Sequence, residues 1–485
     1  MGKKLLKYDL LVIGSGAAGF YAAREAAKCG LKTAVVEKAE PGGTAFYWGS
    51  LPVKMIADKI KAYKKAQSAF SNFKSQLLAE DFLIPDSDFQ KIAAKIKADL
   101  TRAGADLFYG QGRFLASKEF ELGDKLIKAE QVIIASGSRV KTGAGFKLDG
   151  KYIISHKEAV SLKQLPQSLL IVGMNIEGAE FASIFSFLGV KVYILDQEAS
   201  LLPGIDQDLT QVLKAELENN VVELMPSTLL KKARVIETSD QKMVEVELEQ
   251  GENIKTLSVD QLLFTAGREP NFPAGIEKLD IDFDQQGIKV NQKLQTSCSD
   301  LYALGDINGR YGIASTAIND ALTAVKEIMK KLEIDNQLEA AENELNPDQQ
   351  YNFELKTAAE QLIPLNIFTV PEIGGLGLSE EQLKEQNIEY RVKKYYFKDS
   401  WRSLGSGDQG FIKIMLAEED SRVLGIYLVG NELSEIVSSL SLTGLELDLK
   451  QLIENIYVHP TRTEILREAA LAPRVLPGTE TIYGK

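Results

Sequence analysis

Cysteine and histidine are scarce in this chain of 485 residues, which contains two of each. Cys29 and Cys298 lie far apart in the sequence, so they do not form the spacing pattern of a disulfide framework. So few thiols in so long a chain indicate a protein of a reducing compartment. The two histidines, His156 and His459, leave few candidates for proton transfer near neutral pH.

Long apolar runs are also missing. No stretch of about 18 consecutive apolar residues, the length that a membrane-spanning helix needs, occurs in the sequence. Lys7 and Asp9 interrupt the apolar run near the start, and no small-residue cleavage site of the kind found in signal peptides follows. We therefore expect no membrane span and a cytoplasmic protein.

The formal net charge of −12 argues against a nucleic-acid partner, because a phosphate backbone is bound by an excess of positive charge. A local basic patch is still compatible with that total. Apolar residues make up 45% of the chain, as in ordinary globular proteins. Since single cores stop growing at about 250–300 residues, the length predicts roughly three domains.

A glycine-rich turn follows the first apolar segment, residues 8–13. Gly14, Gly16 and Gly19 have the spacing Gly-x-Gly-x-x-Gly, a helical pattern follows them, and the next apolar run ends in Glu37. This order of strand, glycine turn, helix, strand and acid is typical of a dinucleotide-binding unit. In such a unit the helix N-terminus faces the pyrophosphate and the acid binds a ribose.

A second unit of the same plan begins with the apolar segment 168–172. Gly173 and Gly178 keep the first and third glycine positions, but Asn175 replaces the middle one and Glu177 adds a negative charge. Asparagine tolerates a left-handed φ, yet its side chain would fill space that phosphates use. Glu177 would lie next to the place where a nicotinamide stacks. Both changes predict weaker nucleotide binding.

An acid also closes the following strand of this second unit. Asp196 follows residues 190–195, where a carboxylate can bind the adenosine ribose, and no Lys or Arg occurs between Val192 and Leu213 to bind a 2′-phosphate. The sequence therefore favours NAD over NADP. The alternative is a domain kept for its shape, with an impaired nucleotide pocket.

Besides the two glycine turns, six segments of the chain resemble the motifs of the pyridine nucleotide–disulfide oxidoreductases, and they occur in the order found in that family. The resemblance covers about residues 8–475 and is greatest for the dihydrolipoamide dehydrogenase, mercuric reductase and soluble transhydrogenase branch. The segments are Gly42–Lys54, Ile133–Ser138, Thr265–Asn271, Leu301–Asp306, Pro364–Leu378 and Val458–Glu464.

The family's two redox-active cysteines are absent. In the family the first segment reads Gly-Gly-Thr-Cys-x-x-x-Gly-Cys-x-Pro-x-Lys, but here Ala45 and Ser50 occupy the cysteine positions. Neither side chain forms a thiolate or a disulfide. The transhydrogenases also have a hydroxyl residue at the second position, but they keep the first cysteine and lack the histidine, so that match is partial.

The resemblance implies an α/β fold with two Rossmann-like dinucleotide-binding domains, for FAD and NAD, and a C-terminal α+β dimerisation domain. It also implies a homodimer. Residues 333–362 are acidic and longer than the usual connection, so we interpret them as a surface insertion, either a solvent-exposed helix or a partner contact. The expected divisions are 1–150 (FAD, first part), 151–271 (NAD), 272–332 (FAD, second part), 333–362 (insertion) and 363–485 (dimerisation).

The resemblance further implies a set of site residues. His459, oriented by Glu464, would reach the partner's flavin site as an acid or base, and Lys54 and Glu180 would form an ion pair beside the flavin. A helix expected from Ser315 to Leu332 would point its N-terminus toward the isoalloxazine. The expected cofactor-binding residues are Gly14, Gly16, Gly19, Glu37, Gly43, Thr44, Lys54, Gly112, Ser136, Gly137, Asp306 and Ala314 for FAD, and Gly173, Gly178, Glu180, Asp196 and Gly267 for NAD or the return segment.

The leading hypothesis is an FAD-dependent oxidoreductase that passes electrons from a nicotinamide nucleotide to an acceptor other than a disulfide. A quinone, a second nucleotide, oxygen and a protein partner are candidates, and no metal is expected. Tyr47 and Trp48 add aromatic surface that suits a planar acceptor. Two alternatives are a low-turnover FAD-binding partner protein and a dihydrolipoamide dehydrogenase-like protein that uses thiols of a partner.

Overall fold

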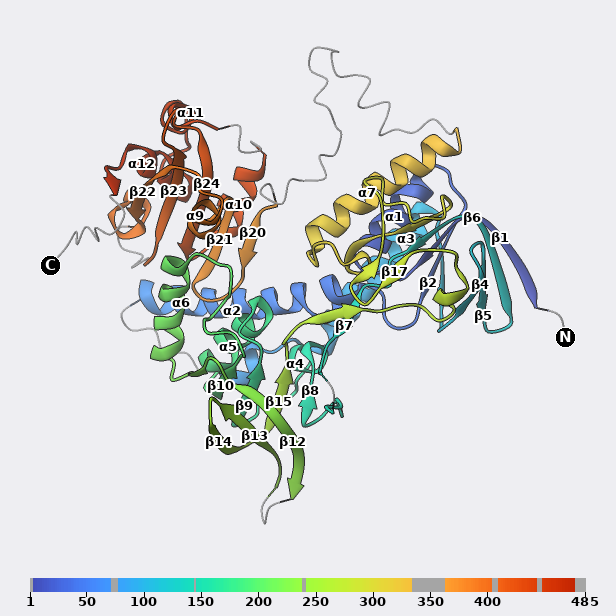
Figure 1. The fold of residues 1–485 in the computed structure, drawn as a ribbon, viewed down its shortest axis with the longest axis horizontal. Helices are drawn as coiled ribbons and strands as arrows, with labels where there is room; N and C mark the ends of the chain where they lie inside the picture. Colours follow the sequence, from blue (N-terminus) through green and yellow to red (C-terminus); the bar gives the residue numbers. More distant parts are fainter. Residues whose placement is uncertain are drawn as a thin grey trace. The chain divides into compact units, whose positions relative to one another are not determined.

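In the computed structural model, contacts between residues divide the chain into two compact units (Figure 1). Unit 1 comprises Met1–Pro52, Ile84–Lys141 and Gly267–Thr357, and unit 2 comprises Val53–Leu83, Thr142–Ala266 and Ala358–Lys485. Within these units the structure describes residues 3–70, 77–143, 145–237, 241–333, 363–403, 409–442 and 447–475.

Unit 1 is built on a mixed sheet with the order β3-β2-β1-β6-β5-β4, in which β19 also pairs with β6. The first three strands, β6 and β19 run parallel, whereas β5 and β4 form an antiparallel extension. The bounds are β1 (Lys4–Ile13), β2 (Thr33–Glu37), β3 (Asp106–Tyr109), β4 (Arg113–Ala116), β5 (Glu119–Leu122), β6 (Lys125–Ile134) and β19 (Leu301–Ala303).

Three helices cover one face of this sheet: α1 (Ala17–Lys28), α3 (Asp86–Ala103) and α7 (Ala314–Lys331). Strand β1 alternates, so that Leu10 and Val12 face these helices while Leu11 and Ile13 face the other core. The buried positions of α1 are mostly alanines, which allow α7 to approach closely. The α/β plan predicted from the first glycine turn is thus confirmed for unit 1.

Unit 2 contains a parallel sheet with the order β11-β10-β9-β15-β8, which carries the second glycine turn. Its strands are β8 (Ile153–Ile154), β9 (Ser168–Val172), β10 (Lys191–Leu195), β11 (Glu223–Met225) and β15 (Gln261–Phe264). Its helices are α4 (His156–Val160), α5 (Ile176–Phe187) and α6 (Gln207–Asn219).

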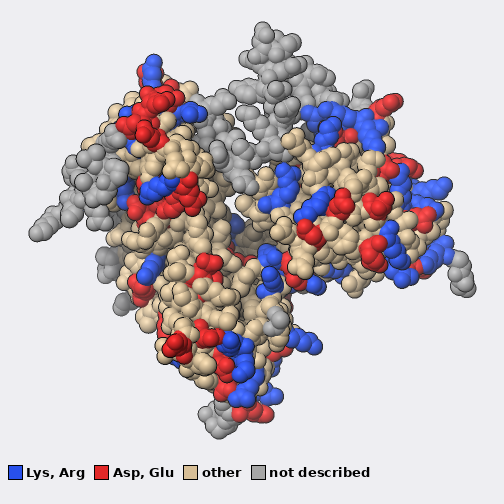
Figure 2. Space-filling model, viewed as in Figure 1, with Lys and Arg blue, Asp and Glu red and all other residues tan. Residues whose placement is uncertain are grey.

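An antiparallel sheet of β12 (Leu229–Glu237), β13 (Lys242–Gln250) and β14 (Asn253–Val259) belongs to the same unit. Ion pairs cross from β12 to β13, with Lys231 Nζ at 2.8 Å from Glu249 and Lys232 Nζ at 3.1 Å from Glu247. Basic and acidic side chains therefore lie side by side on this sheet, at the bottom of Figure 2.

The C-terminal part of unit 2 is a six-stranded sheet with the order β20-β21-β24-β23-β22-β25, whose apolar face is covered by helices. This confirms the expected α+β domain. The strands are β20 (Leu365–Ile367), β21 (Glu372–Gly377), β22 (Tyr390–Tyr396), β23 (Phe411–Ala417), β24 (Val423–Gly430) and β25 (Arg474–Val475). The helices are α9 (Glu380–Glu385), α10 (Ser434–Ser441), α11 (Leu449–Glu454) and α12 (Ile465–Leu471).

The domain boundaries stay predictions. Helix α2 (Ser50–Ala69) continues from unit 1 into unit 2, so that residues 53–83 cluster with unit 2 although the sequence placed them in the first FAD segment. Apart from Glu333, the acidic insertion 333–362 lies outside the described residues. Among the helices that the structure describes, none has both the length and the apolar character needed to cross a bilayer.

Candidate functional site

The first glycine turn excludes side chains at two positions. Gly14 has φ +100°, and a Cβ there would lie 2.4 Å from the carbonyl oxygen of Ala135. A Cβ at Gly19 would lie 2.0 Å from the carbonyl oxygen of Gly14. Both glycines are therefore required by the close approach of β1, α1 and the end of β6, as the sequence predicts.

Gly16 is different, because the space beside it is open. A Cβ at Gly16 would meet only the Cα of Gly43, at 3.9 Å, and Gly43 itself has φ +54°. Gly16 is the N-cap of α1 and provides no side-chain hydrogen bond to the first turn. The free N–H groups of this helix N-terminus thus border an open cradle of glycine backbone, which fits a pyrophosphate.

The acid at the end of β2 fixes this turn. Glu37 is 8% exposed and accepts hydrogen bonds from the N–H of Ser15 (2.9 Å), the Ser15 hydroxyl (2.7 Å) and the N–H of Ala39 (3.0 Å). A carboxylate has about four acceptor positions, so one remains for a ribose hydroxyl. The position expected for Glu37 beside the cradle is what the structure shows.

Ser136 supplies an independent sign of a ligand. Its hydroxyl oxygen is buried and has no hydrogen-bond partner among the described residues, and its Cα lies close to Gly14. A buried polar group without a partner costs about 1–3 kcal/mol, so such groups are normally satisfied by a ligand or water. Gly137 follows with φ +69°, and its carbonyl oxygen accepts the N–H of Asn271 at 2.9 Å.

Arg268 was missed by the sequence interpretation. It lies on β16 (Arg268–Pro270), which pairs with β7 (Ser138–Val140), and its guanidinium donates to the Ser138 hydroxyl (2.7 Å) and the Thr44 hydroxyl (3.2 Å). The Ser138 hydroxyl in turn donates to Asp306. Arg268 thereby joins the redox-motif segment to the loop that carries Asp306. Arg268 lies in the return segment Thr265–Asn271, but nothing in the sequence of that segment shows which residues the arginine contacts.

Asp320 was also missed. It lies on α7 and accepts the N–H of Gly305 (3.3 Å) and the side-chain amide of Asn308 (3.4 Å). Burial raises its pKa. Asp320 therefore ties α7 to the turn of Asp306. Helix α7 begins at Ala314, one residue before the expected start, so the helix prediction is confirmed.

Two further glycines expected at cofactor sites, Gly112 for FAD and Gly267 in the return segment, have different surroundings. A Cβ at Gly112 would lie 2.2 Å from the Phe120 ring and 2.5 Å from the carbonyl oxygen of Glu121, so packing against β5 already requires glycine there. Gly267 has φ +131° and no close neighbour, and it accepts the N–H of Lys141 at 2.9 Å. Their roles toward a cofactor stay predictions.

The segment that would hold the redox disulfide forms a π-helical turn, Thr44–Trp48, followed by α2 from Ser50. Ala45 and Phe46 pack against the core under α1 and α7. The rings of Tyr47 and Trp48 have centroids 4.4 Å apart, and that of Phe89 lies 5.4 Å from Tyr47. The turn is thus lined by aromatic and apolar groups.

The two cysteines cannot replace the missing pair. Cys29 packs against the core on the α1 side of the unit 1 sheet, whereas Cys298 packs against the core on the opposite face. The sheet lies between them, so they cannot form a disulfide with each other.

The second turn repeats the backbone of the first. Gly173 has φ +118°, and a Cβ at Gly178 would lie 1.8 Å from the carbonyl oxygen of Gly173. Asp196 accepts the N–H of Met174 (2.7 Å) and of Glu198 (3.1 Å), as Glu37 does for Ser15 and Ala39 in unit 1. The expected placement of Asp196 is what the structure shows.

Asn175 corrects one expectation. Its backbone has φ −78° and ψ −174°, close to Gly16 with φ −68° and ψ −168°, so its tolerance of a left-handed φ is not used. Its side chain caps α5, because Oδ1 accepts the N–H of Gly178 at 3.1 Å and Nδ2 donates to the carbonyl of Thr265 at 2.6 Å. The side chain thus uses an N–H that would otherwise face a phosphate.

His156 is buried at the start of α4. It is 2% exposed, and its Nδ1 lies 3.5 Å from the Glu177 carboxylate. Glu177 therefore lies next to a buried imidazole, while its neighbour Ile176 is the exposed residue of this turn.

Among the ion pairs of the described residues, none joins Lys54 directly to Glu180, so the expected ion pair is not seen in the single chain. Instead, Lys54 Nζ lies 3.8 Å from the centre of the Phe368 ring, and Glu180 accepts the N–H of Phe368 at 2.8 Å. Burial lowers the pKa of Lys54, partly offset by Glu180, and burial raises the pKa of Glu180, partly offset by Lys54.

The histidine motif has the expected geometry. His459 Nδ1 lies 2.9 Å from Glu464 Oε1, and the other carboxylate oxygen accepts the N–H of Thr461 at 2.8 Å. These contacts, first the Thr461 N–H and then the imidazole, lower the pKa of Glu464. The His459 side chain is 67% exposed within the single chain.

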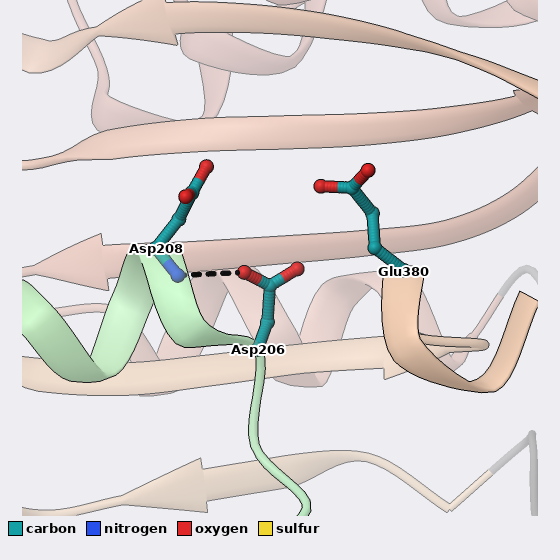
Figure 3. A group of neighbouring side chains, drawn as sticks. All are labelled: Asp206, Asp208 and Glu380. Atoms are coloured by element: carbon teal, nitrogen blue, oxygen red, sulfur yellow. Dashed lines mark hydrogen bonds between the residues drawn. The ribbon is translucent and has the colours of Figure 1, made fainter. Parts of the chain in front are cut away.

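A cluster of three carboxylates elsewhere in unit 2 has the spacing of a metal site: Asp206, Asp208 and Glu380 (Figure 3). The buried ammonium of Lys413 contacts all three, at 2.9 Å from Asp206 and 3.3 Å from Asp208. Burial alone would lower the pKa of Lys413, but the carboxylates outweigh it and raise that pKa. The ammonium of Lys413 therefore binds all three carboxylates and offsets part of their negative charge.

Two dinucleotide-type turns, a glycine cradle and an antiparallel C-terminal domain define a flavoprotein oxidoreductase with a nicotinamide-nucleotide domain. The family described as pyridine nucleotide-disulphide oxidoreductase matches residues 8–321, and its dimerisation domain matches residues 363–470. The chain belongs to this family, whose cofactor is FAD.

Among characterised proteins, the dihydrolipoyl dehydrogenase of Bacillus subtilis is 29% identical, with 96% of this chain and 98% of that protein aligned. The soluble pyridine nucleotide transhydrogenase of Pseudomonas entomophila is also 29% identical, over 96% of this chain and 97% of that protein. The structure of the HOCl-induced flavoprotein disulfide reductase RclA from Escherichia coli superposes with a TM-score of 0.79 at 21% identity, covering 96% of this chain and 99% of that one. This last likeness concerns the fold.

Proposed function

We propose that this chain is a homodimeric FAD-dependent oxidoreductase that moves electrons between a nicotinamide nucleotide, with NADH favoured, and an acceptor other than a disulfide. The observation that carries the proposal is the pair Ala45 and Ser50 at the positions of the family's redox cysteines. With Cys29 and Cys298 on opposite faces of the sheet, the chain has no dithiol to offer an acceptor.

When bound, FAD supplies reversible two-electron chemistry, and the residues of unit 1 fit its binding. The cradle of Gly16 and Gly43 would hold the pyrophosphate, Glu37 would accept a ribose hydroxyl, and Ser136 offers a buried hydroxyl. Asp306 is held by Ser138, so its carboxylate is fixed for a hydroxyl-bearing chain. These contacts support FAD as the resident cofactor.

The aromatic turn favours a planar acceptor. The half-buried rings of Tyr47 and Trp48 stand at the segment where other family members carry sulfur, and the buried ring of Phe89 supports that of Tyr47. Aromatic faces stack on quinones and on nicotinamide rings, whereas a thiol substrate gains little from them. A quinone or a second nucleotide is therefore the preferred acceptor class. The relationship to a transhydrogenase is in keeping with the latter.

His459 is the candidate proton donor. Glu464 fixes the imidazole through Nδ1, which leaves Nε2 for the substrate. Apolar side chains around this motif, Ile456, Val458 and Leu471, are exposed in the single chain. Such a patch favours a second copy as its partner, in keeping with the dimerisation domain. His459 would then serve the site of the partner.

The test is an anaerobic reaction with separate half-reactions. Purified protein is mixed with NADH, bleaching of the flavin is followed, and the reduced protein is then offered menadione, a dye, an oxidised nicotinamide analogue or lipoamide. We expect reoxidation by menadione or the analogue and little by lipoamide. Faster turnover with lipoamide than with menadione would refute the acceptor class. The Ala45→Cys/Ser50→Cys double variant is the matched control and should gain lipoamide turnover.

A second candidate function is a flavoprotein with little turnover that acts through a partner. Asn175, which caps α5, favours this alternative because a nucleotide would compete with that cap. Flavin that neither NADH nor NADPH bleaches, although dithionite reduces it, would support this alternative. A third candidate uses thiols from a partner, and it requires lipoamide activity that appears only when a thiol-bearing protein is added.

A further inference from the structure

Phe368 lies at the centre of a group of four charged residues in unit 2. Lys54 Nζ is 3.8 Å from the centre of its ring, and Lys61 Nζ, seven residues further along α2, is 5.6 Å from it. The main-chain N–H of Phe368 donates to Glu180 Oε1 at 2.8 Å. One residue therefore contacts the lysine through its ring and the glutamate through its backbone.

The second lysine, Lys61, is held by a buried carboxylate. Lys61 forms an ion pair with Glu372, whose side chain is 1% exposed. Glu372 also accepts the N–H groups of Leu433 (2.9 Å) and Ser434 (3.1 Å) at the start of α10. Because Glu372 is fixed by these hydrogen bonds, its ion pair holds Lys61 in place. The Phe368 ring therefore has a second cation nearby, at 5.6 Å from its centre.

We propose that Phe368 is a positioning residue for Lys54: its ring holds the ammonium in the charged form and at a fixed distance from Glu180, in place of a direct ion pair. A cation over an aromatic face is attracted by the ring quadrupole, and this attraction is stronger when the cation is desolvated. Burial acts in the opposite direction and lowers the pKa of Lys54. Glu180 offsets only part of the effect of burial on the Lys54 pKa, and no ion pair of the described residues joins it to Lys54. The Phe368 ring supplies a further attraction for the ammonium.

The consequence for the reaction rests on the proposed function. Under the proposed function, the resemblance of the segment Gly42–Lys54 to the family's motif implies that the charge of Lys54 would influence electron transfer to and from FAD. Phe368 would then tune the reaction by holding that charge.

The experiment isolates the ring from the backbone contact. Phe368→Leu removes the aromatic face but keeps an apolar side chain and the N–H that binds Glu180. Replacing Phe368 by pentafluorophenylalanine keeps the shape and reverses the ring quadrupole, so it tests the same point if the leucine variant folds poorly. Phe368→Trp is the rescue, because indole binds cations best.

The readout is the pKa of Lys54, obtained by competitive labelling of amines across pH with mass spectrometry, on the FAD-loaded protein. We expect Phe368→Leu and the fluorinated ring to lower that pKa by about one unit, a tenfold change in labelling rate at a given pH, and Phe368→Trp to restore it. The matched control is Phe187→Leu, whose ring lies 5.6 Å from Lys64 Nζ on the same helix and should leave Lys54 unchanged.

An unchanged Lys54 pKa in the fluorinated variant overturns the proposal. Labelling needs neither donor nor acceptor, so its result is independent of the proposed function. Conversely, if the pKa shifts as expected while NADH fails to reduce the flavin, the role of Phe368 stands and the proposed function falls.

Discussion

The two glycine turns of this chain have nearly the same backbone but carry different side chains at the helix N-terminus, and the difference at the N-cap changes the hydrogen bonding. In unit 1 the N-cap is Gly16, and the helix begins beside open space. In unit 2 the N-cap is Asn175, whose amide binds the N–H of Gly178 and the carbonyl of Thr265. The acids after the next strands, Glu37 and Asp196, are used in the same way in both. The comparison teaches that a single cap can decide whether a turn is available to a phosphate.

Exchanging the caps gives the largest expected effect on ligand binding. Gly16→Asn brings a side chain into the open cradle of unit 1, where it competes with the pyrophosphate for the helix N–H groups. We expect a loss of about 3 kcal/mol of FAD binding, or about 100-fold in Kd, since hydrogen bonds to charged groups are worth about 1.5–3 kcal/mol each. The flavin content of the purified protein and its recovery on reconstitution measure this. Full flavin content in the variant would show that Gly16 does not border the pyrophosphate.

The next effect concerns stability and separates the two units. Lys413→Met leaves Asp206, Asp208 and Glu380 together without their cation, and breaking such a buried pair costs about 3–5 kcal/mol. Because the cluster belongs to unit 2, we expect hydrogen exchange to rise around α6, α9 and β23 while the FAD turn keeps its protection. Lys394→Met is the control: it removes a contact at 3.3 Å to Asp208 and a contact at 3.9 Å with the Phe411 ring, and it should cost less than Lys413→Met because Asp208 keeps Lys413.

Opening the second turn gives a smaller effect in the opposite direction from the first exchange. Asn175→Gly frees the N–H of Gly178 for a nucleotide, and caps of this kind are worth about 0.5–2 kcal/mol. We expect NADH affinity to rise by about 5- to 20-fold, with only a slight loss of stability because glycine is an acceptable N-cap. Titration of flavin reduction against NADH concentration measures the change. Equal affinity in the two proteins would mean that the cap is not in competition with the ligand.

The smallest effect is a pH dependence confined to unit 1. Lys331, Lys118 and Gln131 outweigh burial and lower the pKa of Asp300 from 3.8 to about 2. Since the folded pKa lies below the unfolded one, the stabilisation is complete above about pH 5 and is lost as the pH falls toward 2. Urea unfolding should show Asp300→Asn to be less stable by about 1–2 kcal/mol at pH 6, with the difference shrinking at pH 3. A difference that is constant from pH 6 to pH 3 contradicts this assignment.

Local rules were sufficient for the glycine turns, the acids after the strands and the His459–Glu464 pair, because each depends on neighbours within a few residues or on a strand–turn–helix unit. The start of α7 and the antiparallel C-terminal sheet also followed from the pattern. The cap formed by Asn175 could have been recognised, since asparagine is among the favoured N-cap residues. The absence of the two redox cysteines was evident from the resemblance and from the identity of residues 45 and 50 alone.

Contacts between distant segments were beyond reach. Arg268 contacts Thr44 across more than two hundred positions of sequence, and the contact of His156 with Glu177 joins the starts of α4 and α5. Lys54 and Glu180 were expected to touch because the motif pairs them, but nothing in the sequence showed that the Phe368 ring would contact the lysine. Lys413 likewise finds its three carboxylates through tertiary packing alone.

Ala45 and Ser50 also change how the protein responds to chemical stress. Arsenite and mercury inhibit dithiol enzymes by bridging two neighbouring sulfurs, and hypochlorous acid and peroxides convert exposed thiolates to higher oxides. A π-helical turn made of alanine, aromatic rings and a serine offers these agents no sulfur to attack. Under the proposed function, the electron path of this chain would therefore withstand oxidants and heavy metals that attack a redox dithiol.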